Sequence, residues 1–268
     1  MTGSRTATRW SLRGLALGYL TVLLLAPLTM IFVKAFEDGI GPPLDAITSP
    51  DGLHALKLTL LMVVIAVPLN TVFGIGCALL LVRHRWWGNS LLDGIINLPF
   101  AISPIVIGLS LFLLYGTDGW FGPTLESAGI KVLFSVPGMV LASVFVSLPF
   151  VVREVVPVLQ EIGTEQEQAA STLGASAWQA FWRVTLPAIR WGVAYGVVLT
   201  TARVLGEFGA VTIVSGSISG QTQTLPLYVA KQFEQFNLPG AYGVSIVLAL
   251  LALSTLLLMN LLKRKDNA

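Results

Sequence analysis

Two charged residues, Arg203 and Glu207, stand inside a long apolar stretch of the sequence. They are four residues apart, a spacing that places both side chains on one face of a helix. An arginine at the centre of a bilayer costs about 2.5–3.5 kcal/mol on insertion scales, so it rarely faces lipid. Two interpretations stay open. Either the pair neutralises itself and holds helices together, or Arg203 supplies positive potential along an anion path while Glu207 keeps binding weak enough for release.

The composition places the chain among membrane proteins. Of its 268 residues, 54% are hydrophobic and 11% are charged, whereas a soluble domain is about 25% charged. A transmembrane helix needs about 20 mostly apolar residues, and six stretches qualify: 13–36, 55–82, 91–115, 132–159, 188–214 and 241–262. The sequence therefore predicts an all-α integral membrane domain of six transmembrane helices over 13–262, flanked by the short segments 1–12 and 263–268.

The distribution of lysine and arginine predicts the orientation, because these residues concentrate on the cytoplasmic side. With a cytoplasmic N-terminus, Arg203 lies within a span and the outer side holds Lys34, Lys57, Lys131 and Lys231. The inner side then holds the other eleven of the 16 basic residues: Arg5, Arg9, Arg13, Arg83, Arg85, Arg153, Arg183, Arg190, Lys263, Arg264 and Lys265. Both termini are predicted to be cytoplasmic, together with the polar segment 160–187 between spans four and five.

The polar segment is predicted to form a helix, a turn and a second helix. Thr164 and Glu167 fit a capping box that would start the first helix, and Gly174 suits the left-handed position that ends it. Ser176 and Gln179 have the same spacing and offer a similar start for the second helix. We expect the second helix to end before Pro187, because the residue preceding a proline favours extended backbone.

An apolar stripe along the polar segment needs an apolar surface to lie against, because side chains at helical spacing share one face. Its members are Leu173, Ala177, Ala180, Phe181 and Val184. Lipid headgroups are one candidate for the opposing surface. A protein partner is favoured, because Arg183 is the only basic residue from 161 to 187 to attract anionic lipid and because several small residues permit close backbone approach.

The sequence shows no motif for catalysis or for holding a metal or cofactor. It contains no G-x-x-x-x-G-K-[ST] phosphate loop, no HExxH and no serine nucleophile elbow. Its one cysteine, Cys77, lies in an apolar run and can form neither an intrachain disulfide nor a CxxC pair. We therefore expect a chain that is not an enzyme and has no metal or cofactor, so that any ATP hydrolysis must come from a partner.

The polar segment resembles the coupling motif of the inner-membrane permease subunits of bacterial ABC importers. That motif reads EAA, three residues, Gly, nine residues, Ile-x-Leu-Pro. The matching positions are Gln168, Ala169, Ala170, Gly174, Val184, Leu186 and Pro187. Two positions depart, since Val184 replaces Ile and Gln168 replaces Glu, which removes a charge from the docking surface. The resemblance implies that 160–187 is a coupling loop seated in a cleft of an ATP-hydrolysing subunit.

Two further stretches, ARVLGEFGAVTIVSG (202–216) and SGQTQTLPLYV (219–229), resemble the sulfate/thiosulfate and molybdate branch of these permeases. The second stretch is more similar to the second of the two sulfate permease subunits than to the first. The resemblance implies a multi-pass protein of the bacterial inner membrane that imports an inorganic oxyanion, with sulfate or thiosulfate favoured over molybdate or tungstate.

The implied partners are a pair of cytoplasmic ATP-binding subunits, a second permease chain that is a homologue or a copy, an extracytoplasmic sulfate-binding protein and the lipid bilayer. Nucleic acid is not among them. The alternative from another class is a secondary transporter or channel without an ATPase, which more often carries ion-coupling charges in the membrane and lacks a docking loop.

Overall fold

The computed structural model describes residues 3–84 and 86–266, and within these ranges every regular element is a helix. Arg85 and the outermost residues of the predicted end segments, 1–2 and 267–268, lie outside the described residues. The elements are α1 (Gly3–Phe36), α2 (Gly41–Thr48), α3 (Pro50–Arg83), α4 (Asn89–Ala101), α5 (Pro104–Tyr115), α6 (Gly122–Ser127), α7 (Val136–Ile162), α8 (Glu165–Thr172), α9 (Ala177–Ala180), the π-helical turn η1 (Phe181–Thr185), α10 (Leu186–Leu205), α11 (Gly209–Ser215), α12 (Leu225–Glu234) and α13 (Leu238–Asp266).

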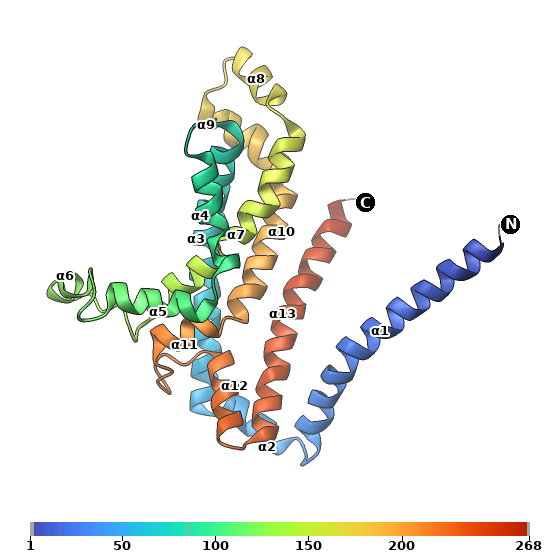
Figure 1. Ribbon diagram of the computed structural model, residues 1–268, viewed down its shortest axis with the longest axis vertical. Coiled ribbons are helices and arrows are strands. Elements are labelled where there is room, and N and C mark those ends of the chain that lie inside the picture. Colours follow the sequence, from blue (N-terminus) through green and yellow to red (C-terminus); the bar gives the residue numbers. More distant parts are fainter. Residues whose placement is uncertain (1–2, 85, 267–268) are drawn as a thin grey trace.

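The helices form an elongated bundle with two distinct ends (Figure 1). Helices α8 and α9 lie at one end, whereas α2 and α12 lie at the other, and α3, α7 and α10 run between the two. Helix α1 diverges from the bundle, and both α1 and α13 extend from the α2 end with their terminal ends towards the α8 side. The most apolar 18-residue stretch of α1 contains no buried residue. This suits a helix that is surrounded by lipid or by another membrane chain.

Among the described residues, four helices are long and apolar enough to cross a membrane: α1, α3, α7 and α13. Two bent pairs of helices raise the number to as many as six. The all-helical membrane architecture is therefore confirmed, and length and composition allow four to six crossings.

Two of the predicted spans, 91–115 and 188–214, are each divided into two helices. The first divides into α4 and α5, which are bent by 112°. Pro104 begins α5, and the preceding Ser103 is extended, with φ −60° and ψ 137°, because a proline disfavours helical backbone in the residue before it. The second divides into α10 and α11 with a bend of 54°, where Gly206 caps α10.

Close helix packing in the centre of the bundle depends on glycine. A Cβ on Gly74 of α3 would lie 2.7 Å from the Cβ of Val151 on α7, and a Cβ on Gly196 of α10 would lie 2.8 Å from the Cα of the same valine. Small residues allow membrane helices to approach this closely. Helices α3, α7 and α10 are therefore held together as one packed unit.

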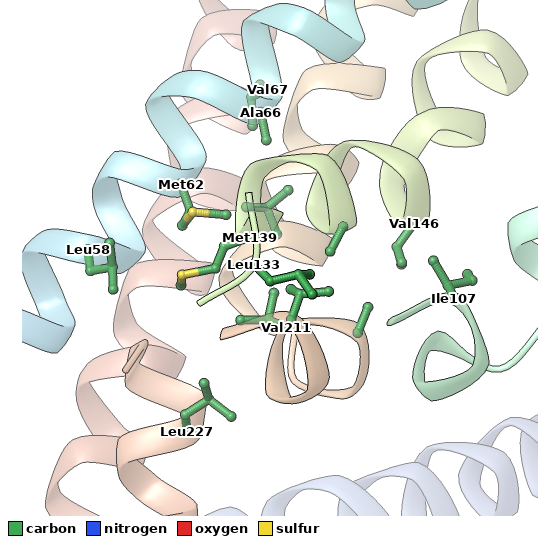
Figure 2. Packing of buried hydrophobic residues seen from close by; sticks show 14 residues of the cluster. Leu58, Met62, Ala66, Val67, Ile107, Leu133, Met139, Val146, Val211 and Leu227 are labelled. Atoms are coloured by element: carbon green, nitrogen blue, oxygen red, sulfur yellow. The ribbon is translucent and has the colours of Figure 1, made fainter. Parts of the chain in front are cut away.

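A second packed region surrounds the break between α10 and α11. Figure 2 shows Met62 of α3, Met139 of α7 and Val211 of α11 converging in this cluster, and all three are buried. Helix α5 joins it at Gly108, where a Cβ would lie 2.7 Å from the carbonyl oxygen of Ala210. The cluster fixes the start of α11 and with it the segment that carries Glu207.

Candidate coupling segment and membrane ion pair

The turn between α8 and α9 has the geometry that the sequence predicts. Gly174 has a φ of +85°, in the left-handed region that disfavours other residues. Its N–H donates to the carbonyl oxygen of Ser171 at 3.0 Å, and the N–H of Ala175 donates to that of Ala170 at 3.0 Å. These bonds satisfy carbonyls that the end of α8 would otherwise leave unpaired.

The two predicted helix starts have different outcomes. A capping box is present at Ser176, whose hydroxyl accepts from the N–H of Gln179 at 3.3 Å while its own N–H donates to Gln179 Oε1 at 2.9 Å. The capping box at Thr164 is wrong, because the Thr164 side chain caps no backbone N–H and instead accepts from Gln168 Nε2 at 3.1 Å. The carboxylate of Glu167 is turned instead towards Arg83, since an ion pair competes with a local cap.

The predicted end of the second helix before Pro187 is also wrong. Leu186 has helical backbone, with φ −63° and ψ −44°, and α9, η1 and α10 follow one another without a break. A proline lacks an N–H and collides with the carbonyl four residues before it in a regular helix. The π-helical turn at Phe181–Thr185 changes the hydrogen-bond register just before the proline. The exposed α9 therefore leads directly into the spanning helix α10.

The exposed surface of this end of the molecule is apolar and aromatic. Leu173 is 88% exposed, and Trp178 and Trp182 are 69% and 49% exposed. The rings of Trp178, Phe181 and Trp182 form a cluster with centroids 5.3–6.1 Å apart. We call Leu173, Trp178, Phe181 and Trp182 the docking surface. The two tryptophans lie outside the stripe found in the sequence, although exposed tryptophan within a polar segment is itself a sign of an interface.

The structure brings the seven motif positions to the same end of the bundle. Gln168, Ala169 and Gly174 are exposed on α8 and its turn, and Ala170 is half-buried. Val184 and Leu186 are half-buried and Pro187 is exposed, where η1 meets α10. Gln168, which replaces the usual glutamate, therefore presents a neutral side chain at this surface.

The pair of Arg203 and Glu207 is formed, but not along one helix. Arg203 lies in the last turn of α10, and Glu207 lies in the break before α11. Arg203 Nη2 is 2.9 Å from Glu207 Oε2, and Glu207 Oε1 accepts from the N–H of Ala210 at 2.9 Å. The Glu207 side chain is 2% exposed and that of Arg203 is 29% exposed. The carboxylate therefore fastens the start of α11 and pairs with the arginine, whose side chain is the less buried of the two.

The fold is therefore that of an all-helical membrane chain with an exposed apolar and aromatic surface at one end. A family described as binding-protein-dependent transport system inner membrane component matches residues 70–265. The chain belongs to this family of ABC importer permeases.

The similar proteins include sulfate permeases. The sulfate transport system permease protein CysW of Synechocystis is 51% identical over 259 residues, which cover 97% of this chain and 94% of the relative. The sulfate transport system permease protein CysT of Escherichia coli is 39% identical over 248 residues, which cover 92% of this chain and 89% of the relative. A solved bacterial ABC transporter involved in the import of the polysaccharide alginate has a TM-score of 0.82 at 18% identity, covering 98% and 96% of the two chains, and has the same fold.

Proposed function

We propose that this chain is the permease subunit of an ATP-driven importer of sulfate or thiosulfate. The observation that carries the proposal is the 51% identity to a CysW protein over 97% of the chain. Membership of a binding-protein-dependent family argues against a self-sufficient secondary transporter or channel. The test is ATP-dependent uptake of radiolabelled sulfate, compared with molybdate, by the chain reconstituted with its partner subunits. Uptake of molybdate without uptake of sulfate would contradict the proposal and identify molybdate as the transported oxyanion.

We assign a proposed partner to each end of the bundle and a further one to its side. The docking surface at the α8 end receives a cytoplasmic ATP-binding subunit, one of a pair. A second permease chain, either a homologue or a copy, completes the path through the membrane. An extracytoplasmic binding protein delivers the anion at the opposite end. In support, a solved alginate transporter of the same fold was captured in complex with its ligand-bound periplasmic protein.

Removal of Trp178 is expected to weaken assembly with the ATP-binding subunit. Trp178 is 69% exposed and stacks on Phe181 with ring centroids 6.1 Å apart. Buried aromatic anchors dominate interface energies, and truncating one typically costs about 2 kcal/mol or more, roughly a thirtyfold loss of affinity. The measurement is co-purification of the ATP-binding subunit with Trp178→Ala and with the parent. Trp120→Ala is the control, because Trp120 is 84% exposed but lies next to α6 in the chain, away from the docking surface. Undiminished assembly of Trp178→Ala would contradict the docking role.

The proposed orientation places the α8 end in the cytoplasm, with six crossings and both termini inside. Glu161→Cys, at the exposed end of α7, is expected to react with a membrane-impermeant thiol reagent only from the cytoplasmic side. Ser127→Cys, exposed on α6, is expected to react only from outside. The native Cys77 is buried and provides the unlabelled baseline. Reaction of both positions from the same side would contradict the six-span topology.

A further inference from the structure

A polar cluster joins the inner ends of the helices to the coupling segment. Glu167 of α8 contacts Arg83, the last residue of α3, with Arg83 Nη2 donating to Glu167 Oε1 at 3.1 Å and Arg83 Nε lying 3.1 Å from Oε2. The hydroxyl of Thr185 in η1 donates to the same Oε1 at 2.8 Å. The Arg83 and Glu167 side chains are 12% and 24% exposed, and Thr185 is buried. The cluster is therefore largely shielded from water.

The remaining donors of Arg83 reach a fourth chain segment. Nη1 donates to the carbonyl oxygen of Leu159 at 3.1 Å, and Nη2 donates to that of Gly163 at 2.7 Å. Both carbonyls belong to the end of α7, where backbone acceptors have no partner within the helix. One guanidinium thus connects α3 and α7 with α8 and, through the shared carboxylate, with η1. The planar fork of arginine holds such an arrangement in a fixed geometry.

Helix α8 has little else to hold it against the bundle. None of its residues is buried, so apolar packing contributes little to its position. Charge-assisted hydrogen bonds shielded from water are stronger than those between neutral exposed groups. Glu167 is therefore the principal side-chain attachment of α8 to the ends of α3 and α7.

We propose that Arg83, Glu167 and Thr185 form a rigid link that transmits movement between the ATP-binding subunit and the spanning helices. The proposal rests on the proposed function, because it assumes that α8 and α9 dock on an ATPase. The three side chains are positioning residues, which need touch neither the anion nor the nucleotide. A displacement of α8 on the ATPase moves Glu167, and the link passes this movement to α3, α7 and the start of α10. Without the link, α8 moves with the ATPase while the spanning helices move less.

The test measures how much anion is taken up for each ATP hydrolysed by the complete reconstituted importer. Glu167→Ala removes every contact of the carboxylate but leaves the docking surface intact. We expect the complex to assemble and to hydrolyse ATP while uptake per ATP falls about tenfold, within the range by which coupled networks alter communication between sites. Thr185→Val removes one hydrogen bond and should lower the same ratio about twofold. Glu161→Ala is the matched control, because it removes an exposed carboxylate at the end of α7 outside the cluster, and it should match the parent.

The outcomes separate the link from a merely structural role. A parent-like ratio of uptake to hydrolysis in Glu167→Ala would overturn the proposal. So would a lower yield of complex with a normal ratio in the complexes that form, since that pattern belongs to folding alone. If Glu167→Ala does not assemble, the ratio of uptake to hydrolysis is measured in Thr185→Val instead. A parent-like ratio in that variant would then overturn the proposal. A parent complex that hydrolyses ATP but imports no oxyanion would overturn the proposed function instead, and the link with it.

Discussion

Gly174→Val is expected to abolish anion uptake while the amount of chain in the membrane stays near the parent level. Gly174 has a φ of +85°, and a left-handed conformation costs a residue with a Cβ roughly 1–2 kcal/mol. Among the described residues other than its two chain neighbours, no atom lies within 4 Å of a Cβ built at this position, so the effect comes from backbone strain and from the altered turn. Relief of the strain would shift α8 relative to α9 and misplace the docking surface. ATP-driven uptake and membrane yield, measured on the same vesicles, check the prediction.

The matched control for this change is Gly174→Asn. Asparagine tolerates left-handed backbone better than any β-branched residue, so Gly174→Asn should retain most of the uptake although it also adds a side chain. Equal loss in both variants would point to side-chain bulk on the docked face instead of strain. If Gly174→Val assembles with its ATP-binding subunit and transports at the parent rate, the coupling role of the segment is wrong.

Arg203→Gln is expected to be severely damaging to assembly. The Glu207 side chain is 2% exposed, and its Oε2 makes no hydrogen bond among the described residues apart from the ion pair at 2.9 Å. Removal of one partner of a buried pair leaves an uncompensated charge, at a cost of about 3–5 kcal/mol. Glu207→Gln should be milder, because the charge that it leaves unpaired is on Arg203, whose side chain is 29% exposed and so less buried than that of Glu207. The yield of assembled complex measures this asymmetry.

The double variant Arg203→Gln with Glu207→Gln distinguishes the two roles proposed for the pair. A neutral amide at position 207 retains an oxygen that can accept from the N–H of Ala210, so assembly should return. We expect uptake to return in part, because the structural role is restored while any attraction of Arg203 for the anion is lost. The four chains form a double-mutant cycle in both yield and uptake. Full recovery of uptake would exclude an essential electrostatic action of Arg203 on the anion.

The coupling segment shows how far local sequence signals extend. Gly174 and the capping box at Ser176 were predictable because each depends on residues within three or four positions of one another. The predicted cap at Thr164 was wrong because its partner Glu167 pairs with Arg83, which lies 84 residues before Glu167 in the chain. The predicted helix end before Pro187 was wrong because the π-helical turn at Phe181–Thr185 accommodates the proline. A single sequence carries no clear signal for such a turn.

The sequence by itself determined the all-helical membrane class, the apolar stretches and the place of the candidate coupling segment. These depend on composition and on short-range spacing, which are properties of the chain before it folds. Only the tertiary structure decided that two spans divide into separate helices, that Glu207 lies in a helix break and that Arg83 meets Glu167 and Thr185. The physical reason is that a buried charge is stable only beside its partner, and contacts between distant segments arise only when the whole bundle packs.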